Sequence, residues 1–162
     1  MTDDEVDHRD LYYKVIDRLS PSVSDCWDDH KGFIPENSPG PLGIKLLYAA
    51  TYADSDISNG GFFQFFHNST GAIAPEAVEG LRLVGLHESA ALLLKAMEFF
   101  GDSYPRDRLA RRAALEALPG YPDIFRREEW DPFLKLGDQY YEIRGGSDGL
   151  TRAANEFVKQ FD

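Results

Sequence analysis

The chain has 162 residues, enough for one domain that buries about two-thirds of the surface that its unfolded form exposes. It carries 28 acidic residues against 17 lysines and arginines, and the net charge of −11 disfavours binding to nucleic acid or to anionic membranes. The single cysteine, Cys26, excludes an intrachain disulfide and a cysteine-rich zinc site.

The charge is unevenly distributed along the chain. Residues 1–60 carry 12 acidic and 5 basic side chains, whereas residues 61–127 carry 8 of each. No stretch approaches the roughly 20 consecutive apolar residues that span a bilayer, and the N-terminus is acidic where a secretory signal would be basic. We therefore expect a cytoplasmic protein without a membrane partner.

The first predicted element is an acidic helix over residues 3–19. Thr2 and Glu5 have the spacing of a capping box, and an imperfect apolar stripe follows them until Pro21 ends the helix. A loop rich in proline and glycine comes next. The helix predicted after Pro41 is apolar on nearly every side, which is typical of a central, buried helix.

Apolar residues recur at helical spacing through the rest of the chain. Residues 42–100 are expected to form the core, and residues 106–162 the C-terminal helices. No alternating strand pattern flanked by hairpin turns occurs, and there is no internal repeat. The sequence thus predicts an all-α fold: a single compact domain over residues 1–162 with about seven helices.

The stretch DISNGGFFQFFHNSTG, at residues 56–71, places two adjacent glycines before four phenylalanines. A phosphate-binding loop would need spaced glycines between a strand and a helix, so we interpret the stretch as a structural corner between two helices. Gly60 or Gly61 would take a positive φ and end the long helix, and Ser58 or Asn59 would cap the next one.

The short helix after this corner is expected to bury one aromatic face. Phe62, Phe65 and Phe66 share that face by their spacing, and His67 lies away from it. We interpret His67 as a capping or surface residue. Because no histidines share a metal-ligand spacing and no nucleophile, base or cofactor loop is evident, we expect no catalytic residues, metal or cofactor.

The corner resembles the signature of a bacterial family of helical domains of unknown function, which we call the NGGF-motif family. The later segment LGDQYYEI, at Leu136–Ile143, is similar to another family segment. A characterised member is a DNA mimic, an acidic dimer whose carboxylates imitate duplex phosphates and occupy the site of a DNA-binding protein. The residues that carry the resemblance are Asn59, Gly60, Gly61, Phe62, Gln64, Phe65, Phe66, Asn68 and Gly71.

We therefore expect a non-enzymatic, acidic protein-interaction domain. The resemblance implies DNA mimicry, a DNA-binding protein as partner and a homodimer, with no direct nucleic-acid binding. An immunity or antitoxin-like inhibitor of a basic enzyme is the alternative, and a small enzyme is a third. An acidic N-terminus also serves simply to keep a protein soluble. The partner-binding candidates are Asp3, Asp4, Glu5, Asp7, Asp10, Asp25, Asp28 and Asp29, with Asp54 and Asp56 as further candidate acids.

One basic cluster interrupts this acidity. It could bind phosphate or the acids of a second subunit, but the spacing of Asp107 with Arg111 and of Arg112 with Glu116 favours ordinary surface ion pairs. Its members are Arg106, Arg108, Arg111, Arg112, Arg126 and Arg127.

Overall fold

The computed structural model of the chain describes residues 11–17, 42–144 and 149–161. In these ranges all regular structure is α-helix or 3-10 helix, with no strand, which confirms the all-α prediction. The predicted first helix is described only as α1 (Leu11–Asp17), with Tyr12 and Ile16 buried. All eight partner-binding candidates, Asp3, Asp4, Glu5, Asp7, Asp10, Asp25, Asp28 and Asp29, lie outside the described residues.

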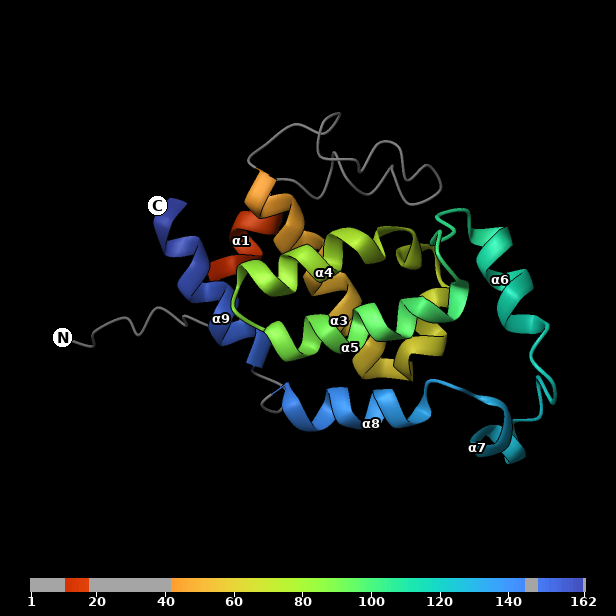
Figure 1. Cartoon of the computed structure of the whole chain (residues 1–162). Coiled ribbons are helices and arrows are strands. Elements are labelled where there is room, and N and C mark those ends of the chain that lie inside the picture. Colours follow the sequence, from red (N-terminus) through yellow and green to blue (C-terminus); the bar gives the residue numbers. More distant parts are fainter. Residues whose placement is uncertain (1–10, 18–41, 145–148, 162) are drawn as a thin grey trace.

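Helix α3 (Leu42–His67) forms the centre of the fold (Figure 1). As the sequence predicts, it is buried on several sides at once, with Leu47, Tyr48 and Phe62 fully enclosed. The 3-10 helix η4 (Ser69–Ile73) turns the chain back into α4 (Ala74–Leu83), which packs along α3, and α5 (His87–Met97) packs on α4.

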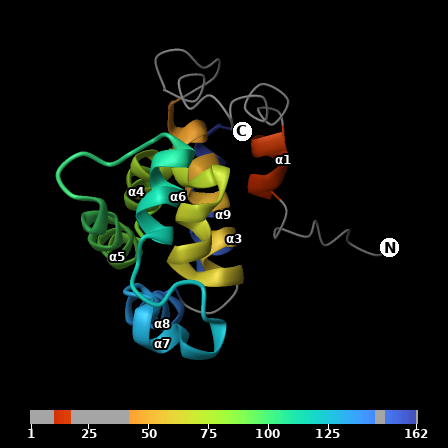
Figure 2. The same cartoon turned by 90° about the vertical axis from the view of Figure 1, so that its right-hand side faces the viewer.

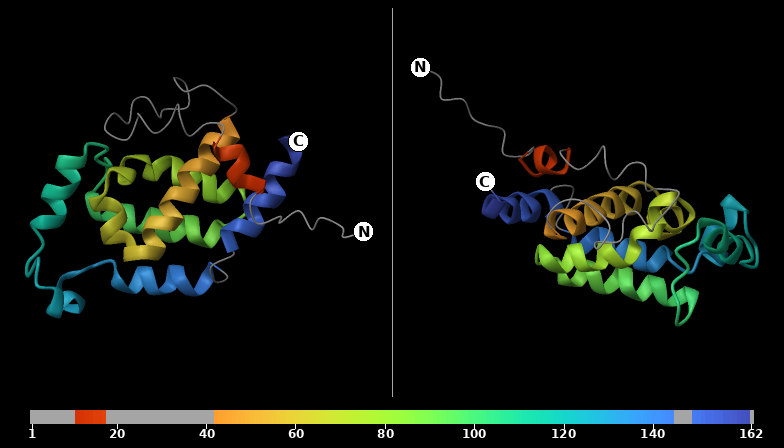
Figure 3. Two further views of the ribbon diagram at one scale, coloured as in Figure 1. Left: turned by 180° about the vertical axis from the view of Figure 1, so that it is seen from behind. Right: turned by 90° about the horizontal axis from the view of Figure 1, so that it is seen from above.

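The remaining helices surround this centre. Helix α8 (Leu134–Ile143) packs against α3 and α5, and α9 (Gly149–Val158) packs against α1 at one end of the molecule. At the opposite end lie α6 (Arg108–Glu116) and the single turn α7 (Arg127–Trp130), as two further views also show (Figures 2 and 3). Short 3-10 helices complete the chain: η5 (Glu98–Phe100), η6 (Ile124–Arg126) and η7 (Lys159–Phe161).

The glycine pair bends α3. Gly60 has φ −145° and ψ 15°, and Gly61 has φ 76° and ψ −177°, a conformation essentially restricted to glycine. The prediction of a corner with a positive φ is therefore confirmed. The prediction that Ser58 or Asn59 caps the second half was wrong, because both precede the two non-helical residues and the second half begins only at Phe62.

The residues after the bend pack as their spacing predicts. Phe62, Phe65 and Phe66 are each 0 % exposed, and each contributes about 1.5–3 kcal/mol of hydrophobic stabilisation. The Gln64 side chain occupies the space that a Cβ at Gly60 would fill. The motif therefore has a clear structural role in bending α3 and burying the aromatic face.

Candidate functional site

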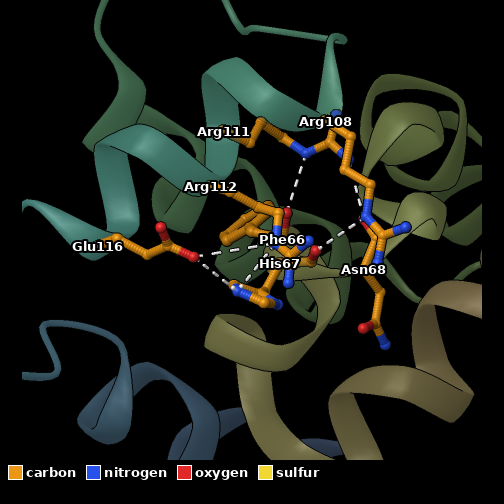
Figure 4. A network of polar contacts seen from close by, with 7 residues as sticks. All are labelled: Phe66, His67, Asn68, Arg108, Arg111, Arg112 and Glu116. Atoms are coloured by element: carbon orange, nitrogen blue, oxygen red, sulfur yellow. Dashed lines mark hydrogen bonds and ion pairs between the residues drawn. The ribbon is translucent and has the colours of Figure 1, made fainter. Parts of the chain in front are cut away.

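Arg111 of α6 binds the C-terminal end of α3, after the glycine pair. This side chain is fully buried, and its Nε donates to the Phe66 carbonyl at 3.0 Å while Nη2 donates to the Asn68 carbonyl at 2.9 Å (Figure 4). The last carbonyls of a helix lack intrahelical partners and carry partial negative charge, so a guanidinium is a suitable cap. Its Nη1 also donates to the Arg106 carbonyl at 2.5 Å. Burial lowers the pKa of Arg111.

His67, the last residue of α3, also contacts α6. Arg112 Nε donates to His67 Nε2 at 3.0 Å, and Glu116 Oε1 lies 3.3 Å from that nitrogen. The Phe63 ring stacks on the imidazole at 5.9 Å between centroids. Arg108 Nε donates to the His67 carbonyl at 3.4 Å. This arrangement joins α6 to α3. His67, predicted as a capping or surface residue, is partly buried, with 21 % of its side chain exposed.

The predicted basic cluster is thus not a free positive patch. The pair of Arg112 and Glu116 is present at 3.9 Å, but Asp107 accepts from the Ala110 amide as the N-cap of α6 and does not pair with Arg111. Sequence reasoning missed the burial of Arg111. Its position four residues before the buried Leu115 was the available signal, since this spacing places both on one helix face.

The other arginines of the described ranges are also engaged within the molecule. Arg152 likewise interacts with another group of the protein. The remaining ion pairs are Arg82 with Glu79, Arg106 with Glu76, Arg126 with Glu129, Arg127 with Asp131 and Arg144 with Asp54.

Two of the candidate acids have structural roles. Asp54 is buried and accepts from Arg144 Nη2 at 2.7 Å and from the Tyr140 hydroxyl at 2.9 Å. The expectation that it faces a partner was therefore wrong. The Asp56 carboxylate accepts from Asn68 Nδ2 at 3.3 Å and from the Thr70 hydroxyl, and it ties the two ends of the corner together.

Other carboxylates remain on the surface without a cationic partner in the described ranges. These ranges hold 17 of the 28 acidic residues and 14 of the 17 basic ones, so most of the excess negative charge lies outside them. Because most arginines of these ranges bind carboxylates or carbonyls of the same chain, the charges left without a partner on the described surface are mainly negative. Asp107 and Asp123 accept main-chain hydrogen bonds but no ion pair. The exposed carboxylates without an ion pair in these ranges are Glu88, Glu98, Asp102, Asp107, Asp123, Glu128, Asp138 and Glu142.

The described residues offer neither a metal site nor a membrane-spanning helix. Over the described ranges, no group of three or more histidine, cysteine, aspartate or glutamate side chains is placed to hold a metal ion. None of the helices described combines the length and apolar character that a bilayer-spanning segment requires. The described residues thus form a helical body with an acidic surface.

Comparisons with known proteins place the chain in a family. A search of curated proteins and a search of solved structures each found no match. The family model described as DMP19-like protein matches residues 40–160, which include the whole glycine corner and α4 to α9. The chain belongs to the DMP19-like protein family.

Proposed function

We propose that this protein is a non-enzymatic, acidic protein-interaction domain that acts as a DNA mimic on a DNA-binding protein. The observation that carries the proposal is the separation of charge. The arginines of the described residues are bound within the molecule, whereas eight exposed carboxylates have no cationic partner there and the whole chain carries −11. Such a surface attracts basic proteins and repels nucleic acid.

The resemblance of the corner to the NGGF-motif family, which includes a DNA mimic, gives the proposal its specific form. Mimicry requires rows of carboxylates on a rigid surface, because duplex DNA presents one charge per ~1.7 Å of its axis. The acids of residues 1–29 are the proposed contact region, since residues 1–60 carry 12 acidic and 5 basic side chains. A homodimer would extend such a row, and we include it in the proposal.

The test is capture of a partner from the native cytoplasm by the full chain. In the test variant, Asp3, Asp4, Glu5, Asp7 and Asp10 are changed together to lysine. We expect this variant to fold and to lose the partner, because exposed carboxylates steer association over about one Debye length, ~8 Å at physiological ionic strength.

The matched control changes two acids that are already ion-paired on the surface, Glu79 and Glu156, to lysine. This control should capture the partner almost as well as the parent does. Undiminished capture by the N-terminal lysine variant would contradict the proposed contact region. A captured partner that has no DNA-binding activity would favour the general inhibitor over the mimic.

A further inference from the structure

Two large apolar side chains of η6 stand in solvent at one end of α8. Phe125 is 94 % exposed and Ile124 is 74 % exposed, and they are adjacent in the chain. Single exposed apolar residues are ordinary, but neighbouring ones at the rim of a hollow mark an interaction site. Here they line a hollow of about 660 Å³ whose other walls include Leu134 and Asp138.

A second hollow lies beside the first along α8. It measures about 260 Å³ and lies between α8 and the glycine corner, with Tyr141 among its lining residues. The two hollows share Arg127, Leu134 and Asp138 in their linings, so they adjoin each other along α8, and we consider them together as one groove. Gly137 lies in its wall, and a Cβ built there would meet nothing within 4 Å. We call this the α8 groove, defined by Ile124, Phe125, Leu134, Gly137, Asp138 and Tyr141.

The charges along the α8 groove favour a cationic occupant. Glu128 and Asp138 line it, Glu142 follows one turn after Asp138, and none of the three is ion-paired within the described ranges. The groove arginines are neutralised, because Arg126 Nη2 lies 2.5 Å from Glu129 and Arg127 Nε lies 2.9 Å from Asp131. Lys135 adds one positive charge at the rim, which leaves the unpaired charge negative.

We propose that the α8 groove binds a basic protein segment that carries an apolar anchor. The apolar side chain of the segment packs on Ile124, Phe125 and Leu134, and a lysine or arginine reaches the Asp138 carboxylate. A strand of nucleic acid would meet the unpaired carboxylates, so a protein segment fits the charge better. This inference rests on the proposed function and adds to it a second contact face, on described residues, that combines apolar and charged contacts.

The probe for the test is a synthetic lysine–leucine peptide whose leucines occupy one face of a helix. A scrambled peptide of the same composition serves as the charge-matched control, because it has the same positive charge without the apolar face. Amide chemical shifts of the full chain report where each peptide binds. We expect the amphipathic peptide to shift residues 124–142 and to bind about tenfold more tightly than the scrambled one.

Three variants make the test specific. Ile124→Ser should weaken the amphipathic peptide about tenfold, whereas Leu109→Ser, which removes an equally exposed side chain (74 %) from α6, should leave its affinity unchanged. Gly137→Leu should occupy the smaller hollow and weaken peptide binding while the fold is retained, since a Cβ at this position meets nothing within 4 Å.

Several results would contradict the proposal that the α8 groove binds a basic segment with an apolar anchor. These are shifts centred on another face, equal affinity for the two peptides, no binding at all, or an Ile124→Ser effect no larger than that of Leu109→Ser. Self-association that Ile124→Ser abolishes would assign the groove to a second copy of the chain and also reject the inference. The proposed function is judged separately, by whether the N-terminal lysine variant loses its captured partner.

Discussion

Arg111 Nε donates a hydrogen bond of 3.0 Å to the carbonyl oxygen of Phe66, so a buried guanidinium on α6 caps the helix that follows the glycine corner. Nη1 and Nη2 of the same side chain bind other main-chain carbonyls. One arginine thus satisfies the end of α3 and fixes α6 against it.

Replacement of Arg111 by methionine should lower the free energy of unfolding by at least about 3 kcal/mol, because several buried carbonyls lose their donor at once. Urea denaturation measures the change. Arg108→Met is the control, since its exposed side chain makes a single bond of 3.4 Å, and it should unfold nearly as the parent does. An equal decrease in the free energy of unfolding for the two variants would show that the buried Arg111 contacts stabilise the fold no more than the exposed Arg108 contact does.

Substitution by alanine should change the free energy of unfolding in opposite directions at Gly61 and at Gly137. Gly61→Ala should lower the free energy of unfolding by about 1–3 kcal/mol, because φ 76° with ψ −177° is strained for any residue with a Cβ. Gly137→Ala should raise it by about 0.5–1 kcal/mol, since the position is helical and open. Thermal melts of both variants, and of Gly60→Val and Gly61→Val, would test the corner; a parent-like melt for the two valine variants would contradict it.

The buried Tyr140 gives the protein a predictable response to alkali. Burial raises its pKa well above the usual value, and its hydroxyl donates to Asp54. Above about pH 10 the unfolded chain therefore releases a proton that the folded chain retains, so stability falls as pH rises. In Tyr140→Phe the loss should be shallower by up to about 1.4 kcal/mol per pH unit.

Urea midpoints at pH 8 and above pH 10 measure this difference. Comparison of parent and variant removes the contribution of the buried Lys45, whose pKa burial lowers and whose effect has the opposite sign. Parallel pH profiles for the two proteins would show that Tyr140 does not stay protonated in the folded state.

The purified protein should not bind duplex DNA. Its net charge is −11, and the arginines that formed the one basic cluster of the sequence are bound to carbonyls and carboxylates of the same chain. A gel-shift assay with random duplex at low salt should show no complex. Salt-sensitive micromolar binding would mean that these arginines exchange their internal partners for phosphate.

The sequence predicts most of this fold because its signals are local. The all-round apolar pattern of α3, the positive φ at the glycine pair and the aromatic face from Phe62 to Phe66 all follow from spacing and residue type. The contacts of Arg111 and Asp54 do not, because their partners lie 45 and 90 residues away in the chain. From sequence alone, a charged residue is expected at the surface. Only the fold shows that Arg111 meets buried carbonyls and that Asp54 meets a buried guanidinium.

The central claim is that this protein occupies the DNA-binding site of its partner. The direct measurement is a competition in which labelled duplex DNA is bound to the purified partner and the full chain is titrated in, with fluorescence anisotropy as the readout. We expect the chain to displace the DNA completely, the displacement to weaken as salt rises, and the N-terminal lysine variant to leave the DNA bound. A ternary complex of partner, DNA and this protein would contradict mimicry.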